Sequence, residues 1–193
     1  RILKKEGIPP ARIEEFRGYL QQVTDETTRV GRIVSDLLAF SRRSRPQRSL
    51  ADLNDIVRRT VALVAHKLEL SGVRVALDLA EPLPSVSCDP GQIQQVVLNL
   101  LLNAAEATRG PGEVAVRTRL FYTGPQVILE VEDHGTGIPP EIQKHIFDPF
   151  FTTKEDGKGV GLGLAVVYGI IEAHEGEIEV DSRVGRGSVF RVF

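Results

Sequence analysis

The sequence predicts an α+β fold, in which one long helix precedes a larger region of mixed helices and strands. Two observations predict it. Apolar residues recur at helical spacing from about residue 11 to residue 41. After a polar, basic stretch at residues 41–49, helical segments are interspersed with segments that alternate apolar and polar residues, as strands do. The 193 residues are 41% hydrophobic and 26% charged, enough for one sizeable core with an appendage.

The first helix carries a heptad stripe. Its members are spaced alternately four and three residues apart, and they are Phe16, Leu20, Val23, Thr27, Val30, Val34 and Leu37. A single helix with such a stripe gains most of its stability from a packing partner. The pattern therefore favours a helical hairpin or bundle, which could be dimeric. Packing of this helix on its own globular domain is the alternative.

The remaining elements follow in order. The basic stretch contains Pro46 and is interpreted as a linker. Asp89 and Pro90 suit the N-cap and first position of a helix. The expected helices are 52–70, 90–108, a short one near 139–146, and 161–174; the expected strands are 73–79, 113–122, 126–133, 177–182 and 188–193.

Bulk properties exclude several classes of function. The net charge of −2 gives no reason to expect a nucleic-acid partner. The single cysteine, Cys88, cannot form an internal disulfide and fits a reducing compartment. No apolar run reaches membrane-spanning length, and no signal peptide is visible. The chain contains no methionine, so we expect it to be a fragment or a processed chain.

The helix 90–108 carries an unusual polar stripe. Its members are Gln92, Gln95, Asn99, Asn103 and Glu106. A solvated face would explain such a stripe, but solvated faces favour better helix formers than asparagine. Two amides four residues apart place two neutral oxygens side by side, and Mg²⁺ takes oxygen ligands, usually only one or two of them from the protein.

Two glycine-rich segments follow. In "EVEDHGTGIPPE" Asp133 ends a strand, where its carboxylate could accept a hydrogen bond from an exocyclic amine; an ordinary turn is the alternative. In "GKGVGLGLA" glycines precede and enter a helix, a setting that suits phosphate, although a flexible loop would also explain them. Neither segment matches the P-loop or the dinucleotide pattern.

The order of these motifs resembles the ATP-binding domain of sensor histidine kinases, which belongs to the same superfamily as the ATPase domain of DNA gyrase. "NLLLNAAEA" resembles the N box, "DHGTGI" the first glycine box, "FDPFFTTK" the F box and "GKGVGLGL" the second glycine box. "GRGS" resembles the last glycine element. The match covers about residues 50–193. Upstream, "VGRIVSDLLAFSR" resembles the second helix of the dimerisation and phosphoacceptor hairpin.

The resemblance implies a domain organisation and a fold. Residues 1–45 would be part of the hairpin, residues 46–50 a linker, and residues 51–193 the ATP-binding catalytic domain. That domain would be a two-layer α/β sandwich, with a mixed, mostly antiparallel sheet covered on one face by helices. ATP and Mg²⁺ are the implied cofactors, and a response-regulator receiver domain and a second copy of the chain are the implied partners. The implied compartment is the cytoplasm, with membrane anchoring of the full-length protein left open and no membrane contact by these residues.

The resemblance also implies roles for individual residues. Asn103 would ligate Mg²⁺, with Asn99 near the phosphates, and Asp133 would read the adenine amine. Gly135 and Gly137 would let the purine approach the backbone, and Ser188 stands where many relatives carry threonine near the adenine. The lid and its phosphate-binding end would comprise Thr153, Lys154, Lys158, Gly159, Val160, Gly161, Leu162 and Gly163.

The chain departs from the family in one respect that matters for activity. None of its four histidines lies in residues 1–50, so we expect the acceptor histidine upstream of Arg1 and no autophosphorylation by these residues alone. An ATP-hydrolysing clamp of the gyrase type is a competing hypothesis, but such enzymes usually carry glutamate where Asn99 stands. A serine kinase of the anti-sigma class and a non-catalytic adaptor are two others. The heptad helix argues against the former, and the intact motifs argue against the latter.

Overall fold

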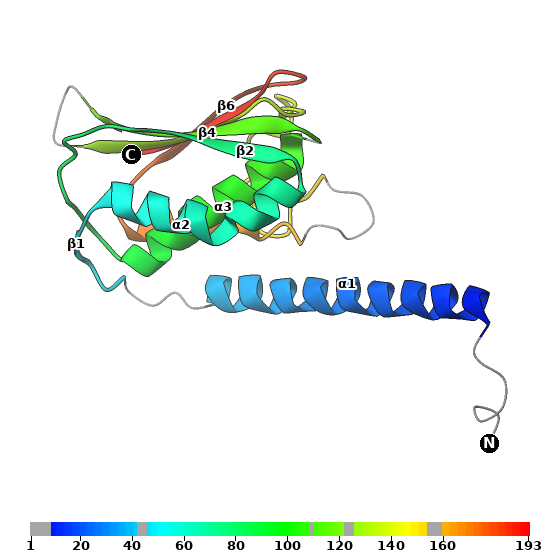
Figure 1. The fold of residues 1–193 in the computed structure, drawn as a ribbon. Helices are drawn as coiled ribbons and strands as arrows, with labels where there is room; N and C mark the ends of the chain where they lie inside the picture. Colours follow the sequence, from blue (N-terminus) through cyan, green and yellow to red (C-terminus); the bar gives the residue numbers. More distant parts are fainter. Residues whose placement is uncertain (1–8, 42–45, 109, 122–125, 154–159) are drawn as a thin grey trace.

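The computed structural model describes residues 9–41, 46–108, 110–121, 126–153 and 160–193, which form a long helix and a two-layer domain (Figure 1). The helix is α1 (Pro10–Ser41). The domain contains a five-stranded sheet in the order β2-β4-β5-β7-β6. The strands are β2 (Val73–Leu79), β4 (Gly112–Leu120), β5 (Val127–Asp133), β6 (Ile178–Arg183) and β7 (Gly187–Val192). Only β2 and β4 run parallel, so the predicted mixed, mostly antiparallel sheet is confirmed.

Three helices cover one face of this sheet: α2 (Leu53–Leu70), α3 (Pro90–Thr108) and α4 (Gly163–Ala173) (Figure 1). Because side chains alternate along a strand, every second residue of β4 and β5 points at these helices. The core forms there, and its most buried members are Val57, Val96, Val97, Leu100, Leu101, Val114, Val116, Val131 and Val167. Burial of α3 on both sides explains why its sequence is apolar apart from the polar stripe.

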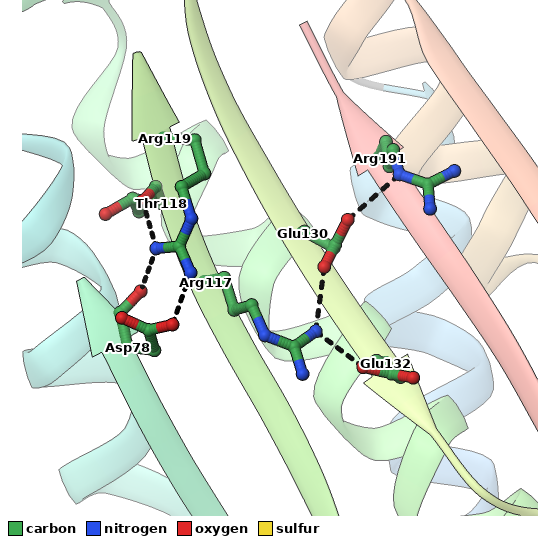
Figure 2. A network of polar contacts seen from close by, with 7 residues as sticks. All are labelled: Asp78, Arg117, Thr118, Arg119, Glu130, Glu132 and Arg191. Carbon is green, nitrogen blue, oxygen red and sulfur yellow. Dashed lines mark hydrogen bonds and ion pairs between the residues drawn. The ribbon is translucent and has the colours of Figure 1, made fainter. Parts of the chain in front are cut away.

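The opposite face of the sheet is charged instead of apolar (Figure 2). Arg117 of β4 lies between two carboxylates of β5, with Nη1 2.8 Å from Glu130 and 2.5 Å from Glu132. These two hydrogen bonds, the one to Glu132 first, raise the pKa of the Arg117 guanidinium. Arg191 of β7 donates to the other oxygen of Glu130 at 2.9 Å. Cross-strand charge pairs therefore cover the face that no helix protects.

The heptad stripe of α1 is not covered by the domain. The helix contacts α4, but the described apolar members of the stripe remain about half exposed or more: Phe16 53%, Leu20 67%, Val23 63%, Val30 50% and Val34 48%. Packing on its own domain, the alternative raised by the sequence, thus leaves these side chains in solvent. Among the helices of the described ranges, none has both the length and the apolar character needed to cross a membrane.

The expected linker is fastened to the domain. Residues Ser49–Ala51 form a strand, β1, which pairs with β3 (Val86–Cys88) in a small separate sheet. The backbone N–H of Gln47 donates to the Asp89 carboxylate at 3.0 Å, and Arg48 donates to the carbonyl of Ala173 at 3.0 Å. This segment therefore lies where the start of α3 and the end of α4 meet. The sequence did not predict it, because three-residue strands leave no periodic pattern.

His174 closes the same junction. Its Nε2 accepts a hydrogen bond from the backbone N–H of Asp89 at 3.0 Å, and its Nδ1 lies 2.8 Å from the carbonyl of Ile170. A carbonyl oxygen only accepts, so Nδ1 carries the hydrogen and the ring is the neutral tautomer. The imidazole thus joins the end of α4 to the residue that caps α3.

One expected element is absent. The sequence predicted a short helix near residues 139–146, but the structure has successive turns there. Hydrogen bonds join the N–H of Ile142 to the carbonyl of Pro139 at 3.1 Å and that of His145 to Ile142 at 2.9 Å. These bonds span three residues instead of the four of an α-helix.

We expect Asp89→Ala to lower the free energy of unfolding by about 1–2 kcal/mol, the usual cost of losing an N-cap. Asp89 Oδ1 accepts from the N–H groups of Gly91 at 3.0 Å and Gln92 at 3.2 Å, as the sequence predicted for an N-cap. Urea denaturation followed by circular dichroism measures the change. Asp89→Asn keeps an acceptor oxygen and is the matched control; equal losses in both variants would contradict the capping role.

Candidate functional site

Two segments of the domain contact one face of α3, namely the loop that follows β5 and the start of α4. The turns at residues 146–153 are bonded to the chain just before α4, and the β6–β7 turn is bonded to the loop after β5. The loop after β5 rests on the last turn of α3, because the N–H of Thr136 donates to the carbonyl of Ala107 at 3.1 Å. The start of α4 meets the middle of α3 through Gly163 and Asn99. Asn99, Asn103 and Ala107 are spaced four apart, so one helix face contacts both ends of the site.

Asn99 acts as a tether between two helices. Its side chain is 9% exposed, accepts a hydrogen bond from the Gln95 amide at 3.1 Å and donates to the carbonyl of Gly163 at 3.2 Å. The buried amide is therefore partnered within the protein. Because Gly163 is the first residue of α4, this bond places Asn99 beside the end of the expected phosphate-binding loop.

Asn103 lies one turn further along α3 and is the neighbour of Asn99 that lacks such partners. It is partly buried, and no hydrogen bond joins its side chain to any residue in the described ranges. Its Nδ2 lies 3.9 Å from the point where a Cβ on Gly163 would stand. An unpartnered amide oxygen beside a glycine-rich loop fits a magnesium ion, which takes most of its ligands from phosphate and water.

Within the same described ranges, no cluster of three or more histidine, cysteine or carboxylate side chains could hold a metal ion. A metal enclosed wholly by the protein is therefore not supported there.

Asp133 ends β5 as a buried carboxylate. The residue is 3% exposed, and its Oδ1 accepts from the N–H of Gly135 at 2.8 Å. Burial raises the pKa of this carboxyl group, against the opposing effect of hydrogen bonds from the Gly135 and Ser188 backbones. No ion pair joins it to a basic side chain that the structure describes. A buried carboxylate with unused lone pairs suits a ligand that donates hydrogen bonds.

The two glycines of the loop after β5, Gly135 and Gly137, are required by the packing of the protein itself. A Cβ on Gly135 would stand 2.3 Å from the carbonyl oxygen of Ala107, and one on Gly137 would stand 2.0 Å from that of Arg183. Gly137 also has a φ of +66°. Close packing of backbone on backbone therefore excludes larger residues at both positions. The role expected from the resemblance, approach of a purine, stays a prediction.

The start of α4 is held against the F-box turns. The N–H of Phe150 donates to the carbonyl of Gly161 at 2.9 Å, and a Cβ on Gly161 would stand 2.4 Å from the carbonyl oxygen of Phe151. Leu162 is 1% exposed, so its side chain belongs to the core and only its backbone could face a ligand. Val160 is partly buried and Thr153 is exposed. Lys154, Lys158 and Gly159 lie outside the described residues.

Ser188 stands directly opposite Asp133 in the β5–β7 ladder, as a residue reading the same ligand would. Its hydroxyl is 2.9 Å from that of Ser182 on β6. Ser182 was not singled out from the sequence. Its only signal there is a polar residue at an inward-facing strand position, which requires the strand register to recognise.

Comparison with known proteins identifies the superfamily. Residues 88–193 match the family described as "Histidine kinase-, DNA gyrase B-, and HSP90-like ATPase". The sensor kinase CckA of Brucella abortus (strain 2308) is 40% identical over 187 residues, which cover 90% of this chain and 20% of that protein. The chain spans less than two fifths of the length of the curated relatives it matches.

Solved structures of histidine kinases have a similar fold. Full-length ShkA in complex with AMPPNP is 27% identical, with a TM-score of 0.79 over 92% of this chain and 38% of that one. The histidine kinase ThkA in complex with the response regulator protein TrrA is 29% identical, with a TM-score of 0.76 over 98% of this chain and 53% of that one.

We expect Asp133→Asn to weaken binding of an adenine nucleotide by about tenfold or more, the usual scale for a hydrogen bond to a charged group. The same change should leave the melting temperature at neutral pH equal or higher. The raised pKa means that the ionised carboxylate costs the folded state stability above the folded pKa, a cost that the neutral amide lacks. Calorimetric titration and thermal melting measure the two quantities.

The pH dependence of nucleotide affinity gives a second comparison between the unmodified chain and Asp133→Asn. The unmodified chain should begin to lose affinity on acidification above pH 3.8, the ordinary value for aspartate, because the carboxyl group takes up its proton early. The ratio of its affinity to that of Asp133→Asn cancels the titration of the nucleotide itself. A ratio independent of pH across the acid range would contradict the assignment of Asp133 as the acceptor.

Proposed function

Because the chain belongs to the family of histidine kinase-, DNA gyrase B- and HSP90-like ATPases, we propose that it is the ATP-binding catalytic portion of a two-component sensor histidine kinase. It would bind Mg-ATP and transfer the γ-phosphate to a histidine. The phosphate would then pass to the receiver domain of a response regulator.

The observation that carries this proposal is the bonding of Asn99. An enzyme that hydrolyses ATP needs a general base to activate water, and an amide cannot take up a proton. Both polar atoms of the Asn99 side chain are also engaged, by Gln95 and by Gly163. The Asn99 side chain thus supports the start of α4 and supplies no general base for ATP hydrolysis. A site that positions phosphate without activating water suits transfer to another nucleophile.

The remaining parts of the site would bind and orient the nucleotide. Asp133 would accept a hydrogen bond from the adenine amine, and Asn103 would supply one ligand to the magnesium ion. Bound magnesium neutralises phosphate charge. Gly163 and the N-terminus of α4 would lie beside the phosphates, where backbone N–H groups favour negative charge. The chain would therefore contribute to the reaction by orienting the nucleotide and by stabilising the negative charge of its phosphates.

The phosphate acceptor would lie outside these 193 residues. None of the four histidines is in residues 1–50, the stretch that contains α1. His174 has both ring nitrogens engaged within the domain. The resemblance of residues 30–42 to the second helix of a phosphoacceptor hairpin supports an acceptor on a neighbouring helix.

The exposed stripe of α1 supports a homodimer in which such hairpins pack together. Side chains about half exposed in a single chain, from Phe16 to Val34, would be buried between helices. The complex of ThkA with TrrA supports a response-regulator partner here. The cytoplasm is the proposed compartment, since both ATP and a receiver domain would be available there.

We expect Asn103→Ala to abolish most of the effect of Mg²⁺ on ATP affinity. Loss of even an indirect metal partner costs about 10–100-fold in metal affinity, so a direct ligand should cost at least about tenfold. Titration of ATP with Mg²⁺ and with a chelator measures the effect. Gln94→Ala, on the same helix, is the control and should retain the full Mg²⁺ dependence. An Asn103→Ala protein with unchanged dependence would remove this residue from the site.

Phosphorylation with ATP labelled on the γ-phosphate tests the activity. We expect no label on this chain alone, and an acid-labile, alkali-stable label when the chain is extended at its N-terminus through an acceptor helix. That stability pattern identifies phosphohistidine. Acid-stable label would indicate a serine kinase instead. Free phosphate without label on either protein would indicate an ATPase and overturn the proposal.

A further inference from the structure

Three buried polar residues form a row across the inner face of the sheet. Asp133 of β5 is opposite Ser188 of β7, and Ser188 is opposite Ser182 of β6. Their exposed fractions are 3%, 4% and 9%. The next inward row of the same strands is apolar and consists of Val131, Phe190 and Val180. A polar row within an apolar face needs partners for each of its groups.

Ser182 uses the full hydrogen-bonding capacity of its hydroxyl. Its Oγ accepts from the N–H of Ile138 at 2.8 Å and lies 3.0 Å from the carbonyl of Gly187 and 2.9 Å from the Ser188 hydroxyl. A carbonyl oxygen only accepts, so the single hydrogen of Ser182 goes to Gly187. The hydrogen between the two serines must then come from Ser188.

This assignment decides what Ser188 can offer a ligand. Its only hydroxyl hydrogen points at Ser182, so the rest of the oxygen presents lone pairs. Asp133, ionised, also presents only acceptors, and the two residues are cross-strand neighbours whose side chains lie on one face. Together they favour a ligand edge that carries hydrogen-bond donors, such as an exocyclic amine. They disfavour a carbonyl at the position of the ligand that faces them.

We propose that Ser182 is a positioning residue for nucleotide specificity, which holds the Ser188 hydroxyl as an acceptor beside Asp133 and so favours a 6-aminopurine over a 6-oxopurine. The inference rests on the proposed function and adds to it the residue that sets the polarity of the base-reading edge. Ser182 does not itself touch the base; it acts through Ser188.

The other two hydrogen bonds of Ser182 fix the backbone segments on either side of Asp133 and Ser188. The bond from Ile138 joins β6 to the loop after Asp133, and the bond to Gly187 joins it to the first residue of β7, directly before Ser188. Gly187 has a φ of +96°, and a Cβ there would stand 1.9 Å from the carbonyl oxygen of Asp133. The turn is therefore close-packed on the strand that carries the carboxylate, and one hydroxyl keeps both segments in register.

The test compares ADP with IDP, which carries a carbonyl in place of the amine, by calorimetric titration in the presence of Mg²⁺. The unmodified chain should prefer ADP. In Ser182→Ala the Ser188 hydrogen has lost its acceptor and can turn toward the ligand, so ADP should bind less well and IDP relatively better. We expect the ADP-to-IDP affinity ratio to fall about tenfold, the scale of one hydrogen bond. A ratio measured within one protein cancels any loss of folded fraction.

Two variants serve as controls. Ser182→Thr keeps the hydroxyl and should restore most of the ratio. Thr60→Val removes another buried hydroxyl, whose one bond among the described residues is to the carbonyl of Ile56 within α2, and should leave the ratio unchanged whatever it does to stability. If Ser182→Ala does not fold, Ser188→Ala carries the test, because it removes the same acceptor and should lower the ratio to a similar extent.

The outcomes are distinct. An equal loss of ADP and IDP affinity in Ser182→Ala would mean that Ser182 only maintains the fold, and an unchanged ratio in Ser188→Ala would mean that this hydroxyl does not read the base; either overturns the inference and leaves the proposed function standing. Absence of nucleotide binding by the unmodified chain would overturn the proposed function itself, and the inference with it.

Discussion

The site depends on one costly group, the carboxylate of Asp133 buried where β5 ends. A buried charge is stable only if hydrogen bonds replace the water it has lost. Here the backbone supplies them, from Gly135 and from Ser188, and this requires the chain on both sides to approach the strand closely. Gly187, which precedes Ser188, makes that approach possible, because a Cβ there would stand 1.9 Å from the carbonyl oxygen of Asp133. The close approach of β7 to the end of β5 thus explains one of the glycines in the β6–β7 segment.

Helix α3 serves as the rigid element to which the other parts attach. Its N-cap, Asp89, accepts from the backbone of Gln47 in the segment that follows α1. Its middle holds the start of α4 through Asn99, and its last turn holds the loop after Asp133 through Ala107. A helix keeps these attachment points at a fixed spacing of about 1.5 Å per residue. Its apolar sides bury it in the core, and its two amides, Asn99 and Asn103, lie on the remaining face.

The open face of the sheet and the exposed stripe of α1 differ in chemistry, and they therefore differ in how stable they are in contact with water. The open face of the sheet is closed by charge pairs such as Arg117 with Glu130 and Glu132, so it is stable in water as it stands. The stripe of α1 exposes phenylalanine, leucine and valine along several turns. Water penalises that surface roughly in proportion to its area. The open face of the sheet therefore carries paired charges, whereas the described residues of α1 carry an exposed apolar stripe at helical spacing.

The sequence by itself determined the element order, most of the helices and strands, and the motifs that predict one site from Asn99, Asn103 and Asp133. These features are local, because periodicity, caps and glycine spacing act over a few residues. It misled at residues 139–146, where successive turns stand in place of the expected helix, and it missed β1 and β3, which are too short for a pattern. Only the tertiary structure decided that Asn99 is partnered by Gly163 whereas Asn103 has no such partner, that Gly135 and Gly137 are packed on backbone, and that Ser182 stands behind Ser188. Those facts depend on strand register and on contacts between residues far apart in the chain, which no local pattern specifies.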